Sequence, residues 1–260
     1  MLGEAERVAV AEALIEARAT AVQTRRLKER HPEATIEDGY AISSLVAERR
    51  QAAGARLVGH KIGLTSRAMQ QAAGIAEPDF GYLFDDMEVG DGATVEHAAF
   101  CQPRIEMELM FVLARPLQGP GVGHLDVLRA TEYVVPSIEI IDARFAGQRV
   151  IEDNIADNAA GAGFVLGGRP VRPEALDLRW VPGLLCRNAE VEETGVAAGV
   201  LGHPALAIAW LANRLGRFGV TLEPGHKLLS GSFVRAIWCS KGEVIRADFG
   251  ELGSVAVQFA

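Results

Sequence analysis

Two long apolar runs, residues 104–113 and 133–142, carry acidic residues where a buried strand normally has none. The first run, Arg-Ile-Glu-Met-Glu-Leu-Met-Phe-Val-Leu, places Glu106 and Glu108 two residues apart. Because side chains alternate between the two faces of a strand, both glutamates should project from the same face. Two like charges this close raise each other's pKa and cost stability unless a cation or a basic side chain compensates them.

A hard divalent cation would be the simplest compensation, because Mg²⁺ and Mn²⁺ prefer carboxylate oxygens. The second run contributes Glu139, which stands between isoleucines and is a candidate third ligand. Three carboxylates from two strands would leave coordination positions for water and substrate, as an open catalytic metal site requires. The spacing of Glu106 and Glu108 alone is equally compatible with an exposed edge strand that carries two solvated glutamates.

The composition is that of an ordinary soluble protein. The 260 residues are 49% hydrophobic and 23% charged, which fits one large domain or one domain with a small appendage. The net charge of -8 argues against a nucleic-acid partner. The cysteines Cys101, Cys186 and Cys239 are widely spaced, which argues against a disulfide framework or a zinc site. With no apolar run of membrane-spanning length and no signal-peptide pattern, we expect a cytoplasmic protein without a membrane partner.

The first 55 residues are predicted to form a helical region. Apolar residues at helical spacing predict one helix over residues 4–31, closed by Pro32. Thr35, with Asp38 three residues later, predicts the start of a second helix that runs to about residue 53. Residues 56–260 are then expected to form a β-rich catalytic domain.

Short apolar runs in this second part predict the strands of a rolled or barrel-like sheet, so the expected fold class is α+β. Two helices should interrupt the sheet, a short one at residues 66–73 and a longer one that begins at Pro204. Residues 153–163 and 192–204 are rich in small and polar residues, and we interpret them as loops that could approach a ligand closely. The predicted strands are 57–65, 104–114, 133–141, 163–167, 228–239, 243–249 and 252–259.

Two further residues are candidates for chemistry. Lys61 stands among glycines and apolar residues, so it either pairs with a carboxylate or extends its ammonium to water. Asp79 follows Pro78, where an aspartate commonly bonds to the backbone of a turn but can also serve as an acid or base. The sequence contains no nucleotide-binding glycine pattern and no Gly-x-Ser-x-Gly hydrolase motif.

The combination of these motifs, in this order, resembles the hydratase and decarboxylase family of the meta-cleavage pathways for aromatic compounds, within the fumarylacetoacetate hydrolase superfamily. The resemblance implies a mixed β-roll body with an N-terminal helical part and a divalent metal, usually Mg²⁺ and possibly Mn²⁺. It also implies metal ligands at Glu106, Glu108 and Glu139, a catalytic lysine at Lys61 and an acid–base partner at Asp79. The motifs that carry it lie at residues 59–65, 77–81, 103–108, 138–144, 157–159, 201–204 and 252–255.

Within this family the Pro-Asp-Phe-Gly motif around Asp79 is similar to the hydratases, whereas the oxalocrotonate decarboxylases tend to lack this aspartate. Similarity at residues 60–67, 85–87 and 192–201 further favours hydration of a dicarboxylate, 2-oxo-hept-4-ene-1,7-dioate, to 4-hydroxy-2-oxoheptanedioate in homoprotocatechuate breakdown. A basic group is then expected at the far end of the substrate pocket. Arg67 is the candidate, with Leu64 and Thr65 beside it, although Arg67 is equally compatible with a surface helix.

Other activities stay open at this point. Related family members hydrate 2-hydroxypenta-2,4-dienoate or decarboxylate 4-oxalocrotonate, and an acylpyruvate-type hydrolase is a further alternative. A purely structural partner role is disfavoured, because charged groups in apolar strands bring no advantage to a scaffold. The resemblance also implies a homo-oligomer that can associate with a related decarboxylase.

Overall fold

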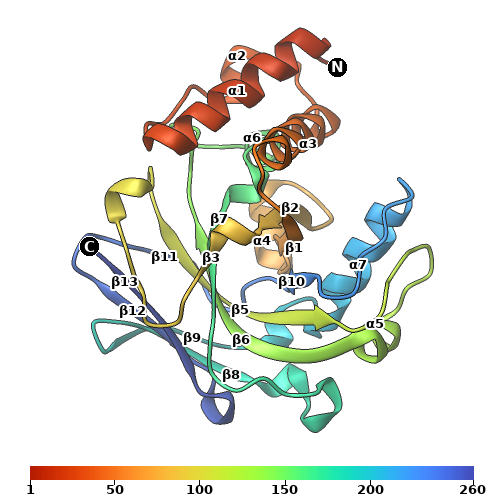
Figure 1. Cartoon of the computed structure of the whole chain (residues 1–260), viewed down its shortest axis with the longest axis vertical. Helices are drawn as coiled ribbons and strands as arrows, with labels where there is room; N and C mark the ends of the chain where they lie inside the picture. Colours follow the sequence, from red (N-terminus) through yellow and green to blue (C-terminus); the bar gives the residue numbers. More distant parts are fainter.

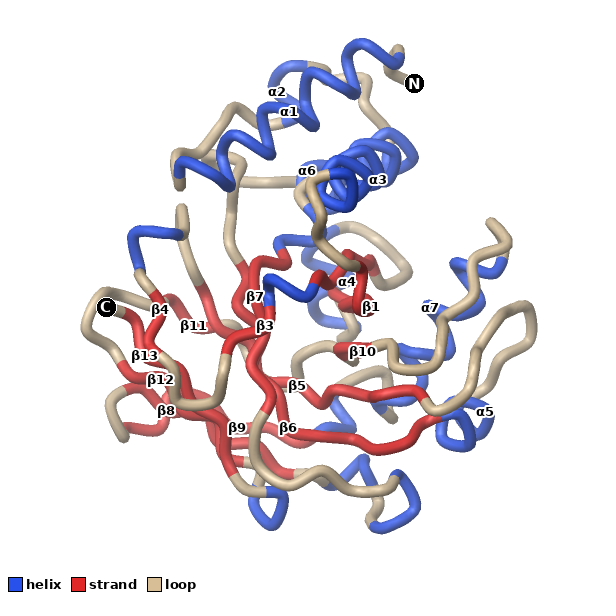
Figure 2. Tube along the Cα trace, in the orientation of Figure 1, coloured by secondary structure: helices blue, strands red, loops and turns tan.

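A computed structural model describes the chain from residue 1 to residue 260, except for the side chains of Ala72 and Ala73. Three N-terminal helices lie over one end of a strongly curved body of strands, and two helices, α5 and α7, flank that body (Figure 1). Figure 2 shows that strands make up most of the body, joined by loops and short helices. The expected α+β fold, with a rolled sheet and an N-terminal helical part, is confirmed.

The predicted helix over residues 4–31 is wrong, because the chain divides there into α1 (Glu4–Thr20) and the short α2 (Leu27–Arg30). Ala21 takes a left-handed conformation with φ 54° and ends α1. Thr24 then pairs with the segment after strand β6, since its N–H donates to Arg144 O and its carbonyl accepts from Ala146 N. These long-range hydrogen bonds stabilise an extended segment where the local sequence favours a helix.

The start of α3 (Ile36–Ala52) confirms the prediction made from Thr35 and Asp38. The Thr35 hydroxyl accepts from Asp38 N, and the Asp38 carboxylate accepts from Thr35 N at 3.0 Å. The fully buried Asp38 also accepts from Leu2 N at 2.9 Å and from the Arg7 guanidinium at 2.7 Å. One carboxylate therefore joins the beginnings of α1 and α3.

The larger sheet runs in the order β2-β1-β10-β5-β6-β7-β3, with β11 also paired to β5. At its centre, β5 and β6 are antiparallel and place Glu106 directly opposite Glu139. The predicted strand 228–239 is wrong, because a loop divides it and its two ends pair with β5 at different places. The strands are β1 (Leu57–Gly63), β2 (Asp79–Phe84), β3 (Glu88–Val89), β5 (Arg104–Leu113), β6 (Thr131–Ile141), β7 (Gly161–Leu166), β10 (Lys227–Leu229) and β11 (Ile237–Trp238).

The smaller sheet runs in the order β4-β13-β12-β8-β9. Its members are β4 (Thr94–Val95), β8 (Pro182–Arg187), β9 (Glu190–Val196), β12 (Val244–Asp248) and β13 (Ser254–Phe259). The loop predicted at residues 192–204 is wrong in its first part, because β9 extends to Val196 and pairs with β8. The remaining helices are α4 (Arg67–Ala73), α5 (His124–Ala130), α6 (Ile151–Ala156) and α7 (Pro204–Gly216).

Strand β5 is buried on both faces, and its side chains alternate between two apolar clusters. Met107 and Leu109 point into the main core, which α7 and the smaller sheet complete. On the other face, Met110 and Val112 join a second apolar cluster with β1, β2 and α3. Glu106 and Glu108 are on this second face, beside an apolar cluster rather than in solvent.

The N-terminal helices have an apolar cluster of their own, which includes Phe145 and Ala156 from the β-rich part. The division of the chain at about residue 55 stays a prediction. Among the residues that the structure describes, no helix combines the length and apolar character that crossing a bilayer demands.

We expect Asp38→Asn to lower the free energy of unfolding by roughly 2 kcal/mol, because hydrogen bonds to a charged group are lost. Burial raises the pKa of Asp38, but hydrogen bonds from Thr35, Arg7 and Leu2 outweigh it and lower the pKa from 3.8 to about 2. The contribution of Asp38 should thus be complete above about pH 4 and disappear as the pH falls through about 2. Urea unfolding at pH 7 and at pH 3 measures this pH dependence, with the exposed Glu33→Gln as control. An equal loss of unfolding free energy at both pH values would contradict the prediction.

Candidate metal centre and active site

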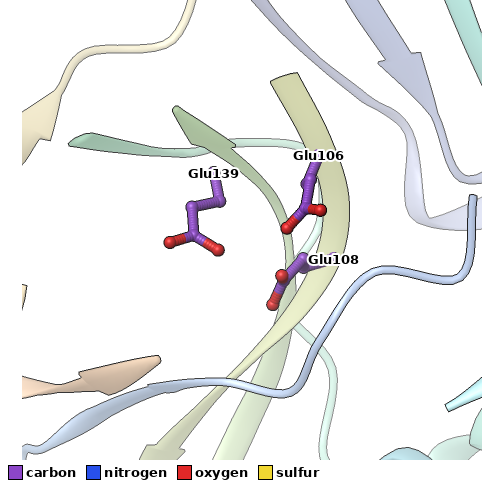
Figure 3. A group of neighbouring side chains, drawn as sticks. All are labelled: Glu106, Glu108 and Glu139. Carbon is purple, nitrogen blue, oxygen red and sulfur yellow. The ribbon is translucent and has the colours of Figure 1, made fainter. Parts of the chain in front are cut away.

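Three carboxylates meet on the inner face of the larger sheet. Glu106 and Glu108 come from β5 and Glu139 from β6, and each offers an oxygen within 4.8 Å of the others. Figure 3 shows their side chains converging on one space between the two strands. The alternation of side chains predicted from the sequence therefore places Glu106 and Glu108 together, and antiparallel pairing adds Glu139. We name these three residues the glutamate cluster.

Most of the oxygens in the glutamate cluster accept no hydrogen bond from the described part of the protein. Glu108 and Glu139 are fully buried, and within the described part of the chain Oε1 of Glu108 and both oxygens of Glu139 accept no hydrogen bond. Oε2 of Glu108 accepts from Gly231 N at 2.7 Å. Burial and repulsion from nearby carboxylates raise the pKa of Glu139 to about 7 and that of Glu108 well above its usual value. Three buried oxygen donors without hydrogen bonds fit a hard divalent cation.

Lys61 is the basic group nearest to this cluster. The side chain, on β1, is only 3% exposed, and its Nζ lies 3.4 Å from Oε2 of Glu139. The same nitrogen donates to Ala159 O at 2.9 Å. Burial lowers the pKa of Lys61, but Glu139 and the other acids around it raise the pKa more, so the ammonium stays charged. The sequence left open whether Lys61 pairs with a carboxylate or extends to water, and in the structure it pairs with a carboxylate.

The carbonyl of Ala159 is directed at Lys61 by an unusual stretch of backbone. Asn158, Ala159 and Ala160 all have left-handed conformations, with φ of 57°, 47° and 62°. Such conformations are costly outside glycine and persist only when the surroundings hold them. Here a buried ion pair joins Arg144 to Asp157, and Arg144 Nη2 also donates to Asp157 O at 2.8 Å.

The Asn158 side chain holds the same stretch from the other side. Its Oδ1 accepts from Tyr82 N at 2.7 Å, and its Nδ2 donates to Tyr82 O at 3.0 Å. This stretch therefore orients the ammonium of Lys61. The sequence indicated a loop suited to approaching a ligand, but not the contact to Lys61.

Asp79 is the first residue of β2 and is 1% exposed. Its Oδ2 accepts from Asn154 Nδ2 at 2.8 Å, whereas its Oδ1 has no hydrogen-bond partner among the described residues. Burial raises its pKa, opposed by the charge of Lys61. A Cβ at Gly63 would lie 2.2 Å from Oδ1 of Asp79, so only glycine leaves room for this carboxylate.

Asn154 is a site residue that the sequence did not indicate. Residues 153–163 were predicted to be a loop, but the helix α6 covers Ile151–Ala156 and presents Asn154 to Asp79. An asparagine in a polar stretch gives no local signal of such a contact. The role follows from the packing of α6 beside β2.

A cavity of about 650 Å³ lies beside the glutamate cluster. Leu64 and Thr65, which were predicted to contact the substrate, line this cavity. Arg67 is exposed and is not among the described residues that line it. The guanidinium groups at the cavity are those of Arg104 and Arg235 instead. Its polar lining includes Lys61, Thr65, Asp79, Arg104, Glu106, Asn154, Glu193 and Arg235.

We expect Mg²⁺ or Mn²⁺ to stabilise the protein through this site. At 100 times its dissociation constant, a bound ion raises the free energy of unfolding by about 2.7 kcal/mol. Glu139→Gln should abolish this increase, while Glu132→Gln, an exposed position on the same strand, should keep it. Thermal unfolding with and without the ion makes the measurement, and an unchanged increase in Glu139→Gln would argue against a metal at this site.

No family model matches the chain. It is 48% identical to the 2-oxo-hept-4-ene-1,7-dioate hydratase of Escherichia coli, with 96% of each chain covered. It is 41% identical to the 2-hydroxyhexa-2,4-dienoate hydratase of Comamonas testosteroni, over 95% of this chain and 94% of the relative.

A solved structure of similar fold is the 4-oxalocrotonate decarboxylase from Pseudomonas putida G7, complexed with magnesium and adipate. It has a TM-score of 0.97 and 34% identity, covering 100% of this chain and 99% of that chain. A yeast fumarylacetoacetate hydrolase family protein shares the fold, with a TM-score of 0.57, 11% identity and 77% and 92% of the two chains covered.

Proposed function

We propose that this chain, which belongs to the hydratase and decarboxylase family of the fumarylacetoacetate hydrolase superfamily, is a divalent-metal-dependent hydratase. The proposed reaction adds water to 2-oxo-hept-4-ene-1,7-dioate, or to its dienol 2-hydroxyhepta-2,4-dienedioate, and gives 4-hydroxy-2-oxoheptanedioate. The observation that carries the proposal is Asp79, a buried carboxylate with a free oxygen beside Lys61 in the cavity. The 48% identity to a hydratase of this substrate supports it.

The glutamate cluster is proposed to hold the ion, with Mg²⁺ as the first choice and Mn²⁺ as an alternative. Its three buried carboxylates fit a hard cation, because most of their oxygens have no other partner among the described residues. When bound, the ion would supply Lewis-acid polarisation of the substrate's C2 oxygen.

Lys61 is proposed to stabilise the negative charge that develops on the C2 oxygen. Its ammonium is buried, charged and held by Ala159 O and Glu139, so it needs little reorganisation when the charge forms. Protonation of the dienol at C5 gives a conjugated 3-ene ketone, whose C4 is electrophilic. Water can then add at C4.

Asp79 is proposed to move the protons or to orient the attacking water. Asn154 occupies Oδ2 of Asp79 and thereby leaves Oδ1 for the water or the substrate. An aspartate placed in this way can accept a proton from water and return it to carbon. Gly63 makes this placement sterically possible.

The proposal also covers the pathway, the compartment and the assembly in which the enzyme acts. The chain would act in the catabolism of aromatic compounds by meta-cleavage, as a cytoplasmic homo-oligomer that can associate with a related decarboxylase. Decarboxylation of 4-oxalocrotonate is the second candidate function, favoured by the TM-score of 0.97 to a decarboxylase. The position of Asp79 favours hydration over it.

The first expected outcome concerns the reaction itself. Metal-stripped protein, mixed with Mg²⁺ and 2-hydroxyhepta-2,4-dienedioate, should consume the dienol and form a product heavier by one water. Dienol absorbance and mass spectrometry measure this, and the reaction should stop when the ion is chelated. Release of CO₂ would identify a decarboxylase. Hydration of only the shorter 2-hydroxypenta-2,4-dienoate would identify that compound as the substrate instead.

The second expected outcome concerns Asp79. Asp79→Asn should lower kcat by about 10²- to 10⁴-fold, the usual contribution of general acid–base catalysis. Mg²⁺ binding, measured by calorimetry, should be unchanged because Asp79 is outside the glutamate cluster. Asp126→Asn, at an exposed position on α5, is the control for the substitution itself. Full turnover in Asp79→Asn would remove Asp79 from the mechanism.

A further inference from the structure

Arg104 lies on the strand that carries the glutamate cluster. It is the first residue of β5, two positions before Glu106, so both side chains project from the same face. Both residues line the cavity. The guanidinium of Arg104 stacks over Trp238 of β11, with 4.9 Å between its Cζ and the ring centroid. The stacking fixes the plane of the guanidinium and leaves its N–H groups available at the edge.

The charge of Arg104 is not compensated by the part of the protein that the structure describes. None of its side-chain nitrogens makes a hydrogen bond or an ion pair there. The other cavity arginine, Arg235, is different, because it is 84% exposed and pairs with Glu193 at 2.6 Å. Arg235 therefore has an acidic partner, whereas no described residue forms an ion pair with Arg104.

The distance along the strand matches the length of the proposed substrate. Two residues of a strand span about 7 Å, which separates the backbone of Arg104 from that of Glu106. In the extended substrate, five carbon–carbon bonds of about 1.5 Å join C2 to C7 and span roughly 6 Å in zigzag form. With C1 and C2 beside the glutamate cluster, the distal carboxylate is within reach of the long Arg104 side chain.

We infer that Arg104 forms a subsite for the distal carboxylate and thereby selects dicarboxylates over monocarboxylates. This inference rests on the proposed function and specifies how it chooses its substrate. It replaces Arg67 in the role that the sequence suggested, because Arg67 is exposed and outside the cavity lining.

The experiment compares two ligands that differ only at the distal end, 2-oxoheptanedioate and 2-oxoheptanoate. Neither contains a double bond to hydrate, so calorimetry in the presence of Mg²⁺ measures binding without turnover. Wild-type protein should bind the dicarboxylate about 10- to 100-fold more tightly, the range for hydrogen bonds to a charged group. Arg104→Gln should remove this preference and leave the affinity for 2-oxoheptanoate unchanged.

Two further variants sharpen the test. Arg129→Gln, an exposed position on α5, should keep the full preference and controls for the loss of one positive charge. Arg67→Gln should also keep it; a loss of preference in Arg67→Gln, with Arg104→Gln unchanged, would overturn the inference. Equal wild-type affinity for the two acids, or binding of neither, would overturn it as well. Hydration of the dienol by the same preparation shows separately whether the proposed function stands.

Discussion

The structure depends on the burial of three carboxylates in a sheet that is otherwise apolar. Strands β5 and β6 are surrounded by core on both faces, yet they bring the glutamate cluster into one small space. Such an arrangement costs stability unless positive charge compensates it. Lys61 supplies one charge, and the oxygens that remain unpaired favour a divalent cation for the rest.

Holding Lys61 in place requires further unfavourable geometry. Three consecutive non-glycine residues, 158–160, have left-handed backbones, and the buried Arg144–Asp157 ion pair and the Asn158–Tyr82 hydrogen bonds hold them there. The N-terminal part contributes too, since Thr24 bonds to Arg144 O. The strained residues lie where the carbonyl of Ala159 must face the ammonium of Lys61. Strained backbone is common at functional sites.

The chemical character of the cavity lining changes along β5. Glutamate oxygens, Lys61 and Asp79 surround the place where a 2-oxo acid would react, and Arg104 stands two residues further along the same face. One strand therefore carries Glu106 and Arg104 at a fixed spacing. If Arg104 binds the distal carboxylate as we infer, the geometry of this strand sets the length of the substrate.

Much of this site was predictable from residues close together in the sequence. Alternation along a strand placed Glu106 and Glu108 on one face, and the Thr35–Asp38 pair marked the start of α3, because both depend on local geometry. The residues themselves also indicated Lys61, Asp79 and Glu139 as candidates, and the resemblance to the family gave each of them a role. Only the tertiary structure decided the break at Ala21, the helix that carries Asn154, the divided run 228–239 and the exposure of Arg67 outside the cavity lining. Each depends on hydrogen bonds or packing between segments far apart in the chain, for which the local sequence contains no signal.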